Sequence, residues 1–291
     1  MGIYSRNGVI VHDMLYSNDV LTADIDKMAD VTAEDFVTKG LIGYWDASWL
    51  ADESTTWLDK STAYQTGSHQ NHRQRHNMLL VNGAKFAYYG SIPTMVVDGV
   101  NDYGYVNEMA TYGSQSMTAS TPGDRFLHHK NLKNLTYEFW FRTSGSTFSS
   151  NGNLYGAIYN NGTRLRFSSG NPGSSFMYVA GMLLGANIGG NWTGGAWQHL
   201  VVTLWISSSA NDELRVYRNS ASVGSDLTGK YTANAGGLPF SATQGLFLLG
   251  TWNGATEMGN FAYNRVRVYE RPLSAAEIAQ NYNAERRYFG L

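Results

Sequence analysis

Alternating apolar and polar positions recur along the chain, and this period of two is typical of half-buried antiparallel β-strands. Four segments show it, each with one apolar face: 135–142, 199–206, 214–218 and 265–269. In the first of these, Leu135, Tyr137 and Phe139 share one face and Glu138 lies on the other. The segment LFLLG at 246–250 is apolar on both faces, which favours a central strand. The pattern predicts an all-β fold of two packed antiparallel sheets, a jelly-roll sandwich.

The end of the chain carries a clear helix signal. Pro272 ends the last predicted strand, and Ser274 stands three residues before Glu277, which is the spacing of a capping box. Ile278 and Tyr282 follow four residues apart, so they lie on one face of a helix. We therefore expect a short C-terminal helix that closes one end of the sandwich.

Residues 1–38 have a different character and are predicted to form an N-terminal anchoring arm, while residues 39–291 form the jelly roll. No glycine follows Gly8 until Gly40. The arm has too few residues for a core of its own, although its first part is rich in apolar side chains. We expect these to bind a partner protein, by strand addition to a sheet edge: Ile3, Tyr4, Val9, Val11, Leu15 and Tyr16.

Composition removes several classes of function. The chain has 291 residues with Lys+Arg 21 and Asp+Glu 23, a balance too even for an electrostatic nucleic-acid binder. It has no cysteine, which excludes disulfides, a thiol nucleophile and a cysteine-based zinc site. No apolar run is long enough to cross a membrane, and the first residues do not resemble a secretory signal. Abundant glycine and aromatic residues with few charges agree with an all-β protein.

Motifs in a fixed order resemble the laminin-G-like, concanavalin A-like jelly roll. They begin with GLIGYWD at 40–46 and TWLDKS at 56–61, continue with VDGVNDY at 97–103 and the FWFR strand, and end with RVRVY at 265–269 followed by RPLSAAEI. The glycine, aromatic and WDAS opening is similar to domains encoded by tailed bacteriophages. The resemblance spans nearly everything after residue 39, and it implies an all-β sandwich found in particle-surface proteins.

Two long polar segments depart from the usual family pattern, and long loops on a rigid sandwich often carry partner contacts. The first contains His69, His72, Arg73, Arg75 and His76. Converging histidines can bind a metal, but this stretch has no carboxylate and its arginines repel a cation. We therefore interpret it as an interface loop whose arginines meet an acidic patch; a solvated basic loop is the plainer alternative.

Two further sets of residues are candidates for ligand binding. Trp192, Tyr231 and Trp252 fall in glycine-rich or polar segments, where aromatic rings can stack on sugars or simply cap the ends of the sandwich. Asp98, Asn101 and Asp102 offer oxygen ligands close together, and related modules bind calcium. The alternative for this second set is a tight turn held by side-chain hydrogen bonds. Apart from this calcium, no cofactor is expected.

The sequence does not favour an enzyme. Jelly-roll glycoside hydrolases need a pair of carboxylates, and acids that alternate along one strand would provide it. Here Glu138 is the only acid in its strand, and Asp212 and Glu213 are adjacent, so that in a strand they point to opposite faces. No nucleophile-elbow motif occurs. We therefore also interpret His199, in a strand motif, as structural.

These observations lead to two hypotheses of different classes. The first is a non-enzymatic structural protein on a phage virion surface, made in the host bacterial cytoplasm and anchored through its arm. Capsid decoration is the first choice within it. Its partners would be other virion proteins and further copies of the chain, for example in a trimer. The alternative is a carbohydrate-binding, lectin-like adhesin or tail-fibre component that binds a host-surface glycan.

Overall fold

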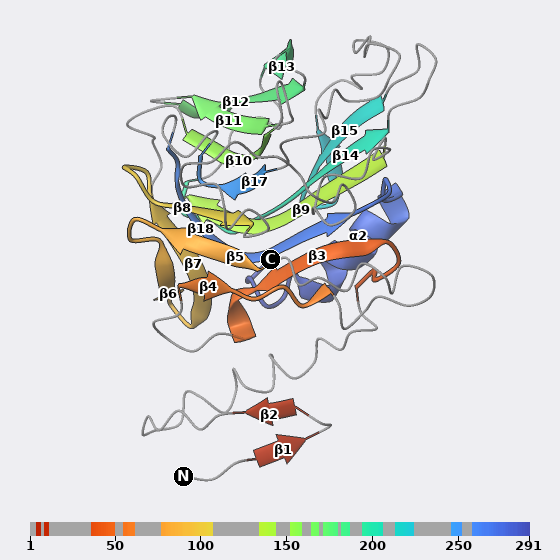
Figure 1. The fold of residues 1–291 in the computed structure, drawn as a ribbon. Coiled ribbons are helices and arrows are strands. Elements are labelled where there is room, and N and C mark those ends of the chain that lie inside the picture. The colour runs from red at the N-terminus through yellow and green to blue at the C-terminus, as the bar shows by residue number, and fades with distance from the viewer. Residues whose placement is uncertain are drawn as a thin grey trace, which may run out of the picture.

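The computed structural model describes the chain in segments. These are residues 4–6, 9–11, 36–49, 55–61, 77–106, 134–143, 152–158, 164–168, 171–179, 182–186, 194–205, 213–223, 246–251 and 258–291. Two large antiparallel sheets face each other across a shared core (Figure 1). The predicted all-β jelly-roll class is therefore confirmed.

The first sheet, called sheet I, has the strand order β16-β15-β14-β9-β18-β7-β6, and β3 also pairs with β18. Its strands are β3 (Leu41–Asp46), β6 (Lys85–Tyr89), β7 (Ile92–Asp98), β9 (Asn134–Thr143), β14 (Gln198–Trp205), β15 (Glu213–Arg218), β16 (Ala221–Val223) and β18 (Asn260–Tyr269). A short 3-10 helix, η1 (Ala47–Trp49), follows β3. Strand β18 is central, because β9 pairs along one of its edges and β7 and β3 share the other.

The second sheet, called sheet II, has the strand order β13-β12-β11-β10-β17-β8-β5-β4. Its strands are β4 (Thr56–Trp57), β5 (Met78–Val81), β8 (Tyr103–Val106), β10 (Gly152–Ile158), β11 (Arg164–Ser168), β12 (Asn171–Val179), β13 (Met182–Ala186) and β17 (Leu246–Leu249). Strand β17 comes from the segment that is apolar on both faces, and it pairs with β10 and β8. Its predicted central position is confirmed.

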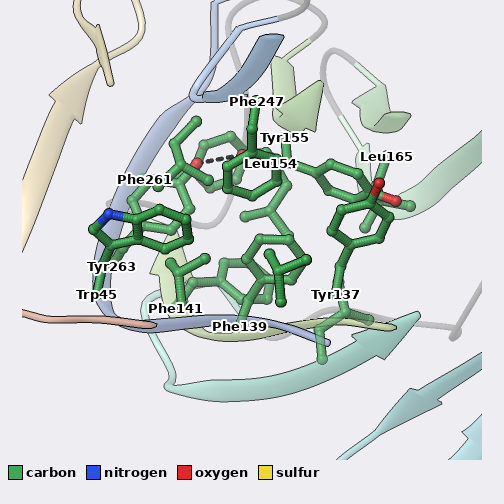
Figure 2. Close-up of a cluster of buried hydrophobic side chains, with 14 of the residues drawn as sticks. Trp45, Tyr137, Phe139, Phe141, Leu154, Tyr155, Leu165, Phe247, Phe261 and Tyr263 are labelled. Carbon is green, nitrogen blue, oxygen red and sulfur yellow. Dashed lines mark hydrogen bonds between the residues drawn. The ribbon is translucent and has the colours of Figure 1, made fainter. Parts of the chain in front are cut away.

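The core between the sheets is dominated by aromatic rings (Figure 2). Tyr137 and Phe139 from β9 in sheet I lie against Tyr155 from sheet II, with ring centroids 5.0 Å apart in both pairs. The Tyr137 and Phe247 rings are stacked at 5.8 Å. The Tyr263 hydroxyl donates to the backbone oxygen of Leu154 at 2.6 Å, so its polar group is satisfied inside the core. The predicted inward face of 135–142 is thus confirmed.

A β-bulge in β18 changes which side chains point inward. The register with β9 shifts between Tyr263 and Arg265, which leaves Asn264 as the extra residue. Phe261 and Tyr263 face the core before the bulge, and Val266 faces it afterwards. The Asn264 side chain donates to the Pro93 backbone oxygen at 2.7 Å and holds the bulge in place. Without this shift, Arg265 would point into the apolar core.

The C-terminal helix α2 (Ala275–Glu285) begins as the sequence predicts but packs in a different place. Ser274 accepts from the Glu277 amide and the Glu277 side chain accepts from the Ser274 amide, which completes the capping box. The expectation that the helix closes one end of the sandwich is wrong: Asn281 and Glu285 bond to side chains on the outer faces of β9 and β18. The helix therefore buries the outer faces of β9 and β18 as well. In a half-buried strand, by contrast, the outer face is exposed to solvent.

The predicted arm is described only in part. β1 (Tyr4–Arg6) and β2 (Val9–Val11) pair as an antiparallel two-stranded sheet of their own (Figure 1). At the other end of the arm, Phe36 and Val37 are buried. The Val37 amide donates to Asn281 Oδ1 on α2 at 2.7 Å, so these last arm residues pack on the sandwich.

Candidate functional site

Several of the residues singled out from the sequence lie outside the described parts of the chain. For the arm, Tyr4, Val9 and Val11 are placed in β1 and β2 by their backbone, while Ile3, Leu15 and Tyr16 lie outside the described residues. The interface loop also lies outside them: His69, His72, Arg73, Arg75 and His76. The same holds for the proposed stacking residues Trp192, Tyr231 and Trp252. These assignments stay predictions.

Asp98 is the last residue of β7, and Asn101 and Asp102 lie in the turn that leads to β8. Asp98 Oδ1 accepts from the backbone amides of Val100 at 2.7 Å and Asn101 at 3.3 Å, which is the hydrogen-bonded turn of the alternative interpretation. Burial and the nearby charge of Asp98 raise the pKa of the Asp102 carboxyl, against the opposing effects of the Asp98 backbone amide and Lys85. The described atoms fit this turn better than a closed calcium site, which needs six or more oxygens.

Two connections between the sheets lie side by side at this end of the sandwich. One is the Asp98–Asp102 turn, and the other is the Asn82-Gly83 turn between β5 and β6. Asn82 Nδ2 donates to the Asn101 backbone oxygen at 3.0 Å. Asn82 and Gly83 have φ values of 61° and 123°, a left-handed turn that Asn-Gly pairs favour. The two turns therefore brace each other.

Directly after these turns, β8 presents two tyrosines on the outer face of sheet II. Tyr103 and Tyr105 are partly exposed, and their ring centroids are 6.0 Å apart. The residues between and after them, Gly104 and Val106, are buried. A Cβ on Gly104 would lie 2.7 Å from the Met78 sulfur, so the side of β8 opposite the two tyrosines packs closely against the core.

Neighbouring strand β5 extends this outer surface. Leu79 pairs with Tyr105 and Val81 pairs with Tyr103, and both aliphatic side chains are partly exposed. We call these four residues, Leu79, Val81, Tyr103 and Tyr105, the tyrosine face. Aromatic rings with an apolar side and a polar hydroxyl are well suited to stack on the apolar face of a sugar while hydrogen-bonding its hydroxyls. The polar turns at its edge add amide and carboxylate groups.

The sequence analysis did not identify the tyrosine face. Its local signal is the alternation of tyrosine with Gly104 and Val106 in YGYV, which a four-residue window shows only weakly. Its second strand, β5, is separated from β8 by the whole of β6 and β7, so the pairing follows from the fold.

The outer face of sheet I holds a second group of polar side chains, centred on Glu138. Glu138 Oε1 accepts from His199 Nε2 at 2.8 Å and from Arg267 Nη1 at 3.0 Å. Its Oε2 accepts from Asn281 Nδ2 at 2.8 Å and from the Tyr269 hydroxyl at 3.1 Å. Burial alone would raise the pKa of Glu138, but the charge of Arg267 and the bonds from His199 and Asn281 outweigh it and lower the pKa to about 2.

The ionic contacts continue from Arg267 to Glu285 and from there to Asp46. Glu285 on α2 binds both Arg267 and Arg265, and it accepts from Trp140 Nε1 at 2.5 Å. Arg265 Nε donates to Asp46 Oδ2 at 3.0 Å. We call Asp46, Glu138, His199, Arg265, Arg267 and Glu285 the buried charge cluster.

The buried charge cluster joins the helix to the sheet and is closed to solvent. The side chains of Glu138, Arg267 and Glu285 are each at most 1% exposed. Their ionic groups are occupied by one another, as buried charges require. His199 accordingly has the structural surroundings that the sequence analysis expected of it.

Two further observations limit the chemistry of the described segments. Within them, no group of three or more His, Asp or Glu side chains converges as a metal site would. None of their helices combines the length and apolar character needed to cross a lipid bilayer.

Comparison with known protein families assigns more than half of the chain to one family. Residues 113–279 match the family model described as the concanavalin A-like lectin/glucanases superfamily. The match begins after β8 and includes β9 to β18 and the first turn of α2. Curated protein sequences give no significant match.

Solved structures resemble the fold at low sequence identity. The sialidase of Trypanosoma rangeli superposes with a TM-score of 0.57 at 14% identity, over 87% of this chain and 34% of the sialidase. The same enzyme in complex with sialic acid gives a TM-score of 0.53. The binding domain of botulinum neurotoxin DC in complex with SialylT gives 0.52 at 11% identity, over 85% of this chain and 52% of that domain. The chain thus spans about a third of the sialidase and half of the toxin domain.

Proposed function

The chain belongs to the concanavalin A-like lectin/glucanases superfamily, and from this premise we propose that it is a non-catalytic domain that binds glycans through the tyrosine face. The observation that carries the proposal is the pair of partly exposed rings on β8, with centroids 6.0 Å apart on one face of a rigid sheet. Rings fixed by a sheet lose little freedom when a ligand covers them, which favours binding.

The position of the acidic residues supports a binding role over a catalytic one. A glycoside hydrolase needs two carboxyl groups that reach the same glycosidic bond. In the described segments, Glu138 and Glu285 come near each other only through their shared contacts with Arg267, inside the protein and away from solvent. Their arrangement stabilises the fold and offers no surface for a substrate.

The direct test is a glycan array probed with the full chain, followed by titration of the best ligand. The double variant Tyr103→Ala/Tyr105→Ala is expected to bind at least about tenfold more weakly, which corresponds to about 1.4 kcal/mol. Tyr88→Ala is the matched control, because Tyr88 is 46% exposed on β6 of the other sheet. It should bind as the unaltered protein does. Failure to bind any glycan, or equal binding by the double variant, would contradict the proposal.

We also propose a second candidate function, a structural role on the surface of a phage virion with anchoring through the arm. The observation that favours it is the β1–β2 hairpin, which forms its own two-stranded sheet instead of joining sheet I or sheet II. A hairpin of two three-residue strands is too small to be stable alone, so it needs a surface on which to pack. Other virion subunits or further copies of this chain would supply that surface.

Deletion of residues 2–20 tests the anchor. The shortened chain should fold but no longer sediment with virus particles from producing cells, whereas the full chain should. Light scattering on the purified proteins would show whether a homo-oligomer, such as a trimer, depends on the same segment. Normal incorporation of the shortened chain into particles would rule out this role.

A further inference from the structure

We propose that the outer face of sheet I carries a further binding site, centred on Arg142, that takes a ligand with a carboxylate group. The site lies on the opposite surface of the sandwich from the tyrosine face and is independent of it. Its evidence is an arginine that its neighbours hold in position and that has no acidic partner among the described residues. A guanidinium in such surroundings can bind a carboxylate through two parallel hydrogen bonds.

Four residues on neighbouring strands form one row across this outer face. Lys85 on β6 pairs with Val96 on β7, and Val96 pairs with Ala262 on β18. Ala262 in turn pairs with Arg142 on β9. The residues next to them in each strand belong to the core or pack against it, so the row itself points outward. The two middle side chains are short, and a long cationic side chain stands at each end of the row.

The Arg142 side chain is held in place by an aromatic ring and by a glycine. Its guanidinium carbon lies 3.4 Å from the centroid of the Tyr89 ring, which is a close cation–π contact. Gly195 has a φ of 79°, and a Cβ there would lie 3.4 Å from Arg142 Nη2. The Gly195 amide donates to Thr143 Oγ1 at 3.1 Å, so backbone without a side chain is fixed beside this nitrogen. A guanidinium that is held in this way loses little freedom when a ligand binds.

The charge of Arg142 is not neutralised by the segments that the structure describes. Its Nε is buried and has no hydrogen-bond partner there. Burial lowers the pKa of the Arg142 guanidinium, and Tyr89, which is not a carboxylate, opposes this effect. A cation that is partly removed from water without a counter-ion is unfavourable, and a bound carboxylate would relieve this cost.

The loops nearest to Arg142 in the sequence also lack an acid. Residues 144–151 follow β9, residues 187–193 lie before β14, and neither segment contains Asp or Glu. Between Glu138 and Asp212 the sequence has no acidic residue at all, although it contains arginines. This stretch of the chain therefore attracts anions and does not supply one.

Lys85, at the other end of the row, has acidic neighbours. Asp98 stands two residues after Val96 on β7, which makes it a diagonal neighbour of Lys85 at about 7–8 Å. Burial and Asp98 raise the pKa of Asp102, and the charge of Lys85 opposes this. Its positive charge is thus partly balanced within the protein, and we assign the carboxylate to Arg142.

The experiment follows the Arg142 Nε–Hε signal in NMR spectra of the ¹⁵N-labelled full chain at low ionic strength, where charges are least screened. The probes are acetate and glucuronate, and acetamide and glucose are their uncharged counterparts. We expect both anions to shift the signal to saturation and both counterparts to leave it unchanged. Binding of glucuronate at least about tenfold tighter than acetate would identify an acidic sugar as the source, and equal binding would identify the free carboxylate. An unchanged signal with both anions, or equal shifts with the counterparts, would overturn the inference.

Four variants, titrated with glucuronate by calorimetry, assign the binding to this site. Arg142→Lys keeps the charge but loses the planar fork, and should bind at least about tenfold more weakly. Tyr89→Phe keeps the ring and should bind within about twofold of the unaltered protein. Arg218→Lys is the matched control, a partly exposed arginine on β15 of the same sheet, and should bind normally. Tyr103→Ala/Tyr105→Ala should also bind normally, which separates this site from the proposed glycan binding. Urea unfolding shows that each variant is folded, and unweakened binding by folded Arg142→Lys would contradict the inference.

Discussion

Glu138 lies at the centre of the contacts that hold α2 on sheet I. Four side chains bond to its two oxygens, and they come from β14, β18 and α2. A buried carboxylate is tolerated only when such partners replace its water, and removal of one charge from a buried ion pair is strongly destabilising. Because folding lowers the pKa of the Glu138 carboxyl well below its ordinary value, the contribution of Glu138 to stability depends on pH.

The pH dependence gives a first prediction for Glu138→Gln. The pKa of Glu138 falls from 4.5 to about 2 on folding. Its charge therefore stabilises the fold fully above the unfolded pKa, and this contribution is lost as the pH falls toward 2. At neutral pH we expect the variant to lose about 3 kcal/mol in the free energy of unfolding. Between pH 6 and pH 3 the difference from the unaltered protein should narrow by about 2 kcal/mol. Urea unfolding at several pH values measures this, and a constant difference would contradict it.

Gly250 gives a second prediction. Its φ of 82° is left-handed, and a Cβ there would lie 2.9 Å from a methyl carbon of the buried Val97. Gly250→Ala should therefore cost about 3 kcal/mol, from the backbone penalty and from overpacking of the core. Gly90 is the matched control, because its φ is 63° but nothing lies within 4 Å of a Cβ. Gly90→Ala should cost only about 1 kcal/mol in the same urea unfolding experiment. Equal losses would show that contact with Val97 is unimportant.

At the residue scale, alternation predicted the inward side chains but not the fate of the outward ones. Leu135, Tyr137 and Phe139 point into the core as expected. Glu138 and Arg267 are charged residues at outward positions, which predicts that they face solvent. No pattern within their own strands shows that a helix covers them. Arg265 faces outward only because of the bulge at Asn264, and a bulge depends on pairing with neighbouring strands.

At the scale of elements, α2 shows which parts of a helix a sequence determines. Its start is local, because the capping box needs only Ser274 and Glu277, and it forms as predicted. Its position depends on distant partners: Glu285 reaches Trp140, Arg265 and Arg267 on strands of sheet I. The charged residues of α2 predict a helix with an exposed side, and nothing in the sequence shows that Glu285 is buried against sheet I. The expectation that α2 closes one end of the sandwich was therefore wrong.

The capping box gives a third prediction. Ser274→Ala removes the oxygen that accepts from the Glu277 amide, at 3.3 Å, and should lower the free energy of unfolding by about 1 kcal/mol. Ser274→Thr keeps a hydroxyl in the same place and should lose only a few tenths of a kcal/mol. Urea unfolding followed by tryptophan fluorescence measures both. Equal destabilisation by the two variants would mean that the cap contributes nothing to the anchoring of α2.

At the scale of the whole molecule, the sandwich could be predicted from the sequence and the tyrosine face could not. Strand patterns and ordered motifs were enough for two antiparallel sheets. The tyrosine face needs β5 and β8 side by side, and these strands are separated in sequence by β6 and β7 of the other sheet. The chain passes from one sheet to the other twice between these strands, at Asn82-Gly83 and at Asp98–Asp102. The residues at both positions predict a turn, but they do not show which strand the next segment will pair with.

The boundary between arm and sandwich gives the last prediction. Phe36 and Val37 belong to the predicted arm, yet Phe36 is 4% exposed, and its ring centroid lies 4.1 Å from the guanidinium carbon of Arg267. A chain that starts at residue 39 loses these contacts and the bond from Val37 to Asn281, while a chain that starts at residue 34 keeps them.

The shorter chain should therefore be less stable than the longer by about 3 kcal/mol, from one buried aromatic side chain and one buried hydrogen bond. Urea unfolding of the two purified chains gives the difference directly. Phe36→Ala in the chain that starts at residue 34 should account for most of it, because the phenyl ring covers Arg267 of the buried charge cluster. If both chains unfold at the same urea concentration, the folded unit begins at residue 39, and the contacts of Phe36 add nothing to it.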